Sequence, residues 1–301
     1  MRFSVWPGSH RPWDEVLSTA LTAEREGWDG LWFADHFMPN TPSGDGPTLE
    51  VWAVLAALAH ATDRLRLGPL VTSVTYRHPA VVANAAAAVD VISGGRLVLG
   101  LGAGWQANEH AAYGLELGDV PTRSDRLEEA AGIIRSLLRD DRTTVDGRFF
   151  TITDAPNEPK PIQPRLPLLV AGKGERRTLR TAARYADEWN GWCTADEVGA
   201  KRAVLAQHCE EFGRDPATIR CSTQALVQIT DDPAAARRFE EATDGRPTLA
   251  GSPAAIVDRV GALVEAGADE LIVPDWPWDD PTERAEQLHR FITEVAPAFR
   301  R

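Results

Sequence analysis

The feature that most constrains the fold of this chain is a repeated unit, in which a short apolar run ends at glycine or polar residues and an amphipathic helix follows. In the first half, strands are expected at residues 2–6, 29–34, 64–71 and 96–101. Helices are expected at residues 13–27, 49–62, 80–92 and 127–138. Gly27 is expected to end the first helix and Thr48 to cap the second. Because such units join parallel strands through right-handed crossovers, the repeat predicts an α/β fold with a parallel sheet.

The repeat is interrupted once and then resumes. Residues 143–152 are typical of a hairpin that turns at Asp146 and Gly147, and residues 154–167 are proline-rich and extended. Four further strands are expected at residues 168–171, 188–192, 220–229 and 270–274. Helices are expected from Pro233 and at residues 175–185, 197–212, 254–266 and 281–296, and a loop at residues 248–251. Residues 141–167 are therefore interpreted as an insertion and not as a domain boundary.

Eight strands alternating with helical segments predict a single (β/α)8 barrel over residues 1–301. The alternative is a doubly wound open sheet. That fold ordinarily needs fewer strands, and its dinucleotide fingerprint, G-x-G-x-x-G after the first strand, is missing from this chain. The barrel is therefore the preferred fold.

Composition narrows the partners of the protein. The net charge of −12 argues against nucleic acid or an anionic membrane as the main partner. Residues 51–59, an apolar run, are too short to span a bilayer, and the N-terminus lacks the features of a signal peptide. The three cysteines form no CxxC pair, which fits reduced thiols. We therefore expect a cytoplasmic protein that acts on a small molecule.

The expected active site lies at the carboxyl ends of the strands, where (β/α)8 barrels carry their catalytic residues. Asp35 and His36 follow the second strand, and histidine can act as a general acid or base near neutral pH. The structural alternative is that Asp35 caps the next loop and His36 is a satisfied polar residue. Other polar residues at predicted strand ends are Thr72, Ser73, Lys173, Asn190 and Asp275. A metal-dependent hydrolase is also considered, but no His-x-His follows the first strand.

Two glycine-rich segments indicate a binding site for a flat, phosphorylated ligand. Gly100, Gly102 and Gly104 alternate at the end of the fourth strand, where missing side chains let a flat ligand approach the backbone. The AGKGERR segment at residues 171–177 offers glycines, cations and a helix start, which suit a phosphate. In addition, the Gly-Pro pair at residues 68–69 lies inside a strand pattern and indicates a bulge.

Five ordered blocks carry a resemblance to a known family. They are ADHF at residues 34–37, RLGPLVTSVTYRHPAVVANAAAAVDVISGGRLVLGLGAGWQANEHAAYG at 66–114, VDGRFF at 145–150, PKPIQPRLPLLVAGKG at 159–174 and AARYADEWNGW at 182–192. Together they resemble the bacterial luciferase-like superfamily, and most closely its branch that uses the deazaflavin coenzyme F420.

The resemblance implies a (β/α)8 barrel with an insertion after strand four and a bulge after strand three, which contains a non-prolyl cis peptide at Leu70–Val71. It places His36 beside the reacting carbon, with Asp35 either holding His36 or bonding to the cofactor. The residues that it implies around the ring and ribityl chain are Asp35, Leu70, Val71, Ser73, Gly102, Trp105 and Asn108. Those that it implies around the phosphate are Ala171, Gly172, Lys173 and Gly174.

The resemblance also shapes the expected activity. The sugar-phosphate dehydrogenases of the family carry a carboxylate where Trp105 stands, so a more apolar substrate is expected here. We expect an oxidoreductase that moves a hydride between F420 and a small organic substrate. The alternatives are an FMN-dependent monooxygenase on the same barrel and a non-catalytic cofactor carrier. The family commonly forms dimers, which implies a homodimer.

Overall fold

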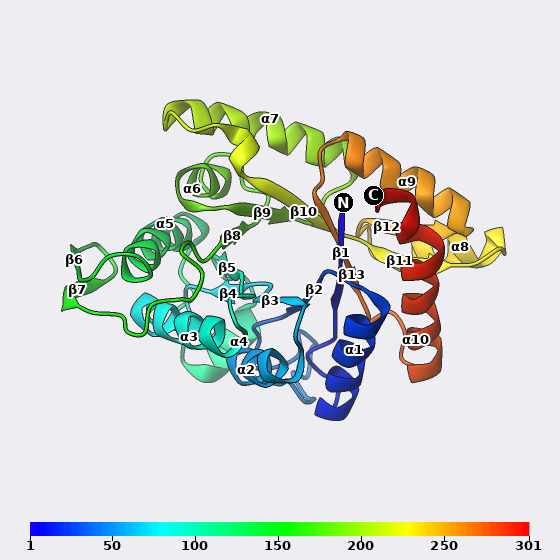
Figure 1. The fold of residues 1–301 in the computed structure, drawn as a ribbon, viewed down its shortest axis with the longest axis horizontal. Helices are drawn as coiled ribbons and strands as arrows, with labels where there is room; N and C mark the ends of the chain where they lie inside the picture. The colour runs from blue at the N-terminus through cyan, green and yellow to red at the C-terminus, as the bar shows by residue number, and fades with distance from the viewer. Residues whose placement is uncertain (301) are drawn as a thin grey trace.

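Parallel strands close into a barrel in the computed structural model, which describes residues 1–300. The strand order in this part of the chain is β3-β2-β1-β13-β10-β9-β8-β5-β4 (Figure 1). The strands are β1 (Arg2–Trp6), β2 (Gly30–Phe33), β3 (Arg66–Pro69), β4 (Thr72–Ser73), β5 (Leu99–Gly102), β8 (Leu168–Ala171), β9 (Glu188–Gly191), β10 (Arg220–Gln224) and β13 (Glu270–Pro274).

The two outer strands of that order, β3 and β4, are consecutive pieces of one strand, separated by Leu70 and Val71. A parallel bridge between Leu67 and Leu97 joins β3 to the segment before β5 and completes the circle. Counting β3 and β4 as one, eight parallel strands form the barrel within residues 1–300, as predicted. The (β/α)8 fold is therefore confirmed, and the doubly wound sheet is not formed.

Helices cover the outside of the barrel (Figure 1). They are α1 (Trp13–Glu26), α2 (Val51–Ala61), α3 (Pro79–Ile92), α5 (Val120–Leu137), α6 (Thr178–Tyr185), α7 (Ala195–Glu211), α9 (Pro253–Glu265) and α10 (Pro281–Arg290). Gly27 ends α1 with a φ of 85°, in the left-handed conformation that glycine adopts without strain. The predicted Thr48 cap of α2 is wrong, because the Glu50 carboxylate accepts the Ala53 N–H instead.

The apolar core has two parts. The larger part fills the space between the strands and the surrounding helices. The smaller part fills the barrel interior, where inward-pointing side chains from successive strands meet. It consists of Trp6, Trp32, Ala34, Leu70, Val98, Leu169 and Ile272. The barrel is therefore packed at its middle and can be open only toward its ends.

The bulge lies at Leu70 and Val71, which separate β3 from β4, whereas Gly68 and Pro69, where it was expected, still pair with β2. The Leu70–Val71 peptide bond is cis, as predicted. The glycines of β5 face this bulge. A Cβ on Gly100 would overlap the Pro69 carbonyl, and a Cβ on Gly102 would lie 2.6 Å from Val71 Cγ2. These glycines were expected to make room for a flat ligand. Glycine is required at both positions in the first place because the neighbouring strand approaches so closely.

Outside the barrel, β6 (Thr143–Asp146) and β7 (Thr151–Ala155) form the hairpin of the expected insertion, with residues 147–150 as its connection. The predicted seventh strand is in fact two strands, β10 and β11 (Leu226–Ile229). β11 leaves the barrel and pairs with β12 (Thr248–Gly251), where a loop was expected, and α8 (Pro233–Glu241) connects them. The loop prediction failed because TLAG is short and gains its strand conformation only from a partner more than 20 residues away.

Candidate active site

A cavity of about 1010 Å³ opens at the carboxyl ends of the barrel strands. Its lining comes from separate parts of the chain, as the barrel topology requires. It includes ten of the twelve residues that the family resemblance implies at the site, namely Asp35, His36, Leu70, Val71, Ser73, Gly102, Trp105, Ala171, Gly172 and Lys173, and lacks Asn108 and Gly174. The structure therefore brings ten predicted residues to one cavity, and their individual roles stay predictions.

His36 is held by a carboxylate that the sequence analysis did not assign. Its Nδ1 lies 2.8 Å from Glu109 Oε1, and Glu109 is fully buried at the start of the short helix α4 (Ala107–Tyr113). The same carboxylate accepts the Phe37 N–H at 2.7 Å and the hydroxyl of Tyr76. The expectation that Asp35 holds His36 is therefore wrong, because Glu109 does so.

The protonation of this cluster follows from its contacts. Burial favours the neutral form of Glu109, but hydrogen bonds from His36, Tyr76 and Phe37 outweigh it and lower the pKa of its carboxyl group. Burial and the neighbouring Glu109 raise the pKa of Tyr76, so Tyr76 remains a hydroxyl donor. Because an ionised carboxylate only accepts, Nδ1 of His36 carries the hydrogen of the shared bond. Nε2 of His36 then remains free of hydrogen bonds within residues 1–300.

Asp35 lies in a different environment from His36 and Glu109. Its side chain is buried, and Oδ2 accepts a 2.6 Å hydrogen bond from Arg77 Nη1, while Arg77 also reaches Glu50 at 2.6 Å. Burial raises the pKa of Asp35, although the Arg77 guanidinium opposes that shift. Oδ1 of Asp35 is buried without a hydrogen-bond partner in the described chain. An unpaired buried acceptor is costly, so this atom fits a ligand that offers an N–H or O–H group.

The expected phosphate segment lies at the cavity, but two of its three cations already have partners. Lys173 Nζ is 3.0 Å from Glu197 Oε1, and Arg177 pairs with Asp125. The following helix, α6, begins at Thr178 and not at Glu175 as predicted. Gly172 has a φ of 131° and, with Thr178, lines the cavity. Backbone and hydroxyl groups are therefore better placed for a phosphate than the Lys173 ammonium.

Two polar residues expected at the site have structural contacts instead. Asn108 Nδ2 donates to the Pro39 carbonyl at 3.1 Å, so it holds the loop after His36 against α4. Asp275 is buried and accepts the Gly8 N–H at 2.8 Å, with Arg11 and Arg284 within 4 Å. Neither residue lines the cavity.

Aromatic side chains form one wall of the cavity. Trp6 ends β1, and Trp192 and Trp276 follow β9 and β13. Their ring centroids are 4.7 to 6.1 Å apart. The Trp105 indole, 58% exposed, stands edge-on to His36 at 5.5 Å. Trp105 therefore places an apolar group directly beside the His36 ring.

Comparison with known proteins identifies the family. Residues 1–241 match the family model described as luciferase-like monooxygenase. The chain belongs to the luciferase-like monooxygenase family. The F420-dependent hydroxymycolic acid dehydrogenase of Mycobacterium tuberculosis is 30% identical, over 95% of this chain and 85% of that protein. The F420-dependent glucose-6-phosphate dehydrogenase of Intrasporangium calvum is 35% identical, over 92% of this chain and 85% of that protein.

Solved structures share the fold of this luciferase-like protein. An F420-dependent secondary alcohol dehydrogenase, in complex with an F420-acetone adduct, superposes with a TM-score of 0.85 at 21% identity, over 100% of this chain and 99% of that chain. A coenzyme F420-dependent tetrahydromethanopterin reductase from Methanopyrus kandleri superposes with a TM-score of 0.83 at 20% identity, over 99% of both chains. At this level of identity, the two superpositions support the fold.

Within residues 1–300, no group of three or more His, Cys, Asp or Glu side chains is arranged to hold a metal ion. Every helix within residues 1–300 is too short or too polar to cross a lipid bilayer.

We predict that the buried pair of His36 and Glu109 is strongly coupled. A double-mutant cycle with His36→Ala and Glu109→Gln, read by urea unfolding, should give a coupling energy of about 1.5–3 kcal/mol, as for hydrogen bonds to charged groups. The matched control is the exposed pair of His289 and Glu26, joined through the same atoms at 2.9 Å. Its coupling should stay within about 1 kcal/mol. Equal coupling in the two cycles would contradict the assignment.

Proposed function

We propose that this protein is an F420-dependent oxidoreductase that interconverts an apolar alcohol and the corresponding carbonyl compound. The observation that carries the proposal is the meeting, in one cavity, of the bulge at Leu70 and Val71 with His36 held by a buried carboxylate. Relatives named as F420-dependent dehydrogenases align over most of this chain and support the cofactor.

The residues of the cavity fit the cofactor. The deazaflavin ring would lie against Leu70 and Val71, and the unpaired Oδ1 of Asp35 would accept a hydrogen bond from the cofactor. Ser73 and Gly102 line the same part of the wall. The phosphate would be taken by the segment from Ala171 to Gly174 together with Thr178, which begins α6.

The chemistry follows from the protonation of His36. Oxidation of an alcohol removes a hydride from carbon and a proton from oxygen, and bound F420 would supply the hydride chemistry. Nε2 of His36 accepts the proton from the substrate hydroxyl, and it returns the proton when a carbonyl compound is reduced. Glu109 is a positioning residue, because it fixes the ring through Nδ1 and stabilises the imidazolium that forms.

The lining of the cavity supports an apolar substrate. Trp6, Trp192 and Trp276 offer a continuous aromatic surface, and Trp105 adds an indole beside His36. Trp105 stands where the sugar-phosphate dehydrogenases of the family carry a carboxylate, which supports a preference for apolar substrates over sugar phosphates. The relative named as a hydroxymycolic acid dehydrogenase and the structural neighbour named as a secondary alcohol dehydrogenase agree with an alcohol substrate.

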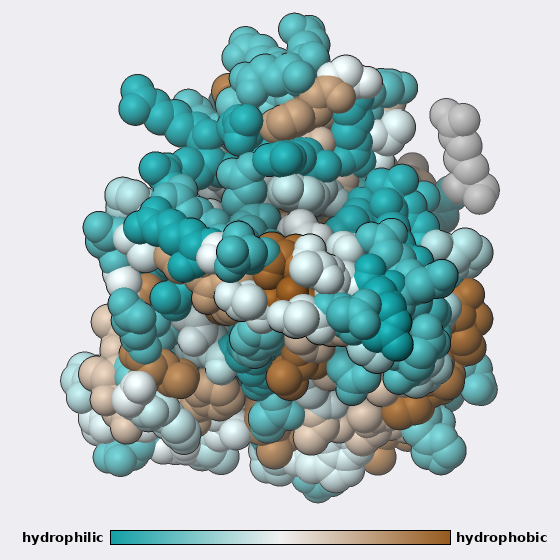
Figure 2. All heavy atoms as spheres, turned by 90° about the vertical axis from the view of Figure 1, so that its left-hand side faces the viewer, coloured by the Kyte–Doolittle hydropathy of each residue, from teal (hydrophilic) through white to brown (hydrophobic). Residues whose placement is uncertain are grey.

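We also propose that the protein is a homodimer joined through α2 and α3, which pack side by side. Neither helix exposes a charged carboxylate, ammonium or guanidinium group, although a quarter of the chain is charged. The exposed residues are Ala53, Ala57, His60, Val81, Asn84, Ala88, Val91 and Ile92. Figure 2 shows pale and brown residues gathered in its lower half, the part of the molecule that contains these helices. Small residues let a second copy of the chain approach closely. In a dimer with two-fold symmetry the same face of both copies forms the interface, so one such face is enough.

The three cysteines support a cytoplasmic location for the enzyme. Cys193, Cys209 and Cys221 are free and buried. Persistent free thiols fit a reducing compartment.

We predict that His36→Ala lowers turnover at least about a hundredfold, the usual contribution of a general acid or base, while F420 affinity changes only a few-fold. Turnover is measured as the substrate-dependent absorbance change of F420, and affinity by quenching of its fluorescence. His289→Ala, in the exposed pair, is the control and should retain full turnover. Unchanged turnover in His36→Ala would remove His36 from the mechanism.

We predict that Ala88→Arg, which places a charge in the middle of the exposed face of α3, converts the dimer to a monomer. Sedimentation velocity should give about twice the chain mass of 32.8 kDa for the wild type and the chain mass for the variant. Ala262→Arg, on the exposed side of α9, is the control and should remain dimeric. A monomeric wild type, or a dimeric Ala88→Arg variant, would contradict this interface.

A further inference from the structure

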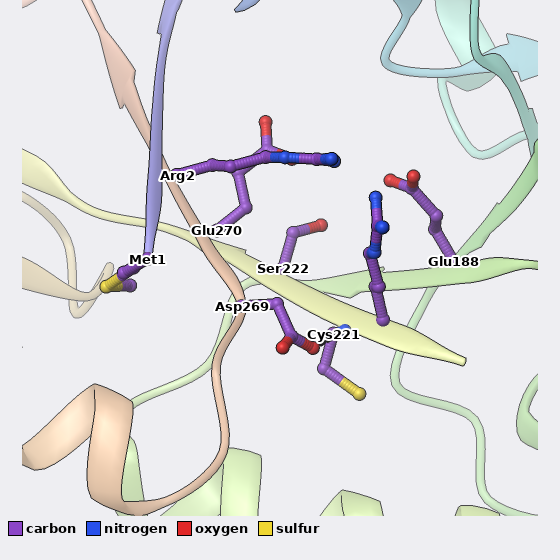
Figure 3. A pocket seen from close by; sticks show the side chains of 8 residues that line it. Met1, Arg2, Glu188, Cys221, Ser222, Asp269 and Glu270 are labelled. Carbon is purple, nitrogen blue, oxygen red and sulfur yellow. Dashed lines mark hydrogen bonds between the residues drawn. The ribbon is translucent and has the colours of Figure 1, made fainter. Parts of the chain in front are cut away.

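A second pocket, of about 290 Å³, lies at the opposite end of the barrel from the active-site cavity (Figure 3). It is formed by the first residues of β1, β9, β10 and β13 and the residues that precede them. The lining residues are Met1, Arg2, Glu188, Arg220, Cys221, Ser222, Asp269 and Glu270. This pocket shares no residue with the active-site cavity.

The carboxylates of this pocket already have donors. Glu270 accepts Ser4 Oγ at 2.6 Å and Trp32 Nε1 at 2.8 Å through Oε1, and Arg66 Nη1 at 2.9 Å through Oε2. Glu188 Oε1 accepts Arg66 Nη2 at 2.5 Å. Asp269 Oδ2 accepts the Cys221 N–H at 2.7 Å. Most of the acceptor capacity at this end of the barrel is therefore used by groups other than Arg2 and Arg220.

The two arginines of the pocket, in contrast, have no such partners. The side chains of Arg2 and Arg220 make no hydrogen bond or ion pair with residues 1–300, and Arg2 Nη1 is buried. Figure 3 shows the Arg2 side chain extended over the pocket, near Glu270 and Ser222. Burial, together with the nearby charges of Arg66 and Arg220, lowers the pKa of Arg2, and the carboxylates of Glu270 and Glu188 only partly oppose that shift. Guanidinium groups nevertheless stay charged at neutral pH, and none of the carboxylates that line the pocket lies within ion-pair distance of either one.

We propose that this pocket binds a small oxyanion of the phosphate class, held by the guanidinium groups of Arg2 and Arg220. A guanidinium offers a planar fork of N–H groups, which matches two oxygens of a phosphate or carboxylate. The pocket has unused hydrogen-bond donors and few unused hydrogen-bond acceptors. It therefore favours a ligand that only accepts hydrogen bonds.

The anion acts on stability and not on the reaction. Arg2 begins β1 and Arg220 begins β10, and these strands are separated by β13. One ligand that contacts both arginines joins two strands that are not hydrogen-bonded to each other. Residues at this end of a (β/α)8 barrel serve its stability, whereas the catalytic residues lie at the other end. Binding to the folded state alone raises the unfolding temperature by mass action.

The test measures thermal unfolding of the full-length protein with saturating F420, so that the cofactor's own phosphate occupies the active-site cavity. Inorganic phosphate is compared with chloride at equal ionic strength. Relative to chloride, phosphate should raise the unfolding temperature of the wild type by about 2–4 °C, and this rise should be lost in Arg220→Gln and Arg2→Gln. Arg220 is exposed, so its variant should fold even if Arg2→Gln does not.

Arg237→Gln is the matched control, because Arg237 is exposed on α8 and makes no ion pair within residues 1–300. It should respond to phosphate as the wild type does, which separates binding from the general stabilising effect of phosphate on proteins. A response in Arg220→Gln equal to that of Arg237→Gln would overturn the proposal, and so would a wild type that responds equally to phosphate and chloride. Turnover should be unchanged in Arg220→Gln, so the result does not depend on the proposed reaction.

Discussion

The structure depends on the packing of the bulged third strand against the glycines of β5. A side chain at Gly100 would overlap the Pro69 carbonyl, so only glycine lets the two strands approach at this point. The bulge places Leu70 in the interior cluster and both Leu70 and Val71 in the cavity wall. The bulge thereby gives the cavity at the carboxyl end of the barrel a flat, apolar floor. A strand without the bulge would instead continue the regular barrel wall.

The same segment is also linked to the helix that carries Glu109. Ser73 Oγ lies 2.6 Å from Thr75 Oγ1, which lies 2.7 Å from Nε2 of His110 on α4. Glu109, the preceding residue of α4, is thus held in place beneath the loop that carries His36. A chain of short polar contacts therefore runs from Ser73, which follows the bulge, to His110 of α4. The bulge is thereby linked to the helix that carries Glu109.

Sequence patterns predicted those features of the fold that depend on residues close together in the chain. The strand–helix repeat gave the eight barrel strands, and Gly68 and Pro69 indicated the bulge, because these signals lie within a few residues. The five family blocks then pointed to the luciferase-like family and to F420, in agreement with the names of the curated relatives. Patterns did not predict β12, whose strand conformation depends on pairing with β11. The resemblance left Asp35 either to hold His36 or to bond to the cofactor, and no short-range pattern pointed to Glu109, which lies 73 residues from His36 in the chain.

The central claim is that the bulge and the glycine-backed wall form a seat for the deazaflavin ring. The most direct measurement is a titration of the apoprotein with oxidised F420 and, separately, with FMN, followed by quenching of ligand fluorescence. The account predicts saturable binding of one F420 per chain, with FMN bound at least about tenfold more weakly, a difference of about 1.4 kcal/mol. Absence of saturable F420 binding, or tighter binding of FMN, would contradict it.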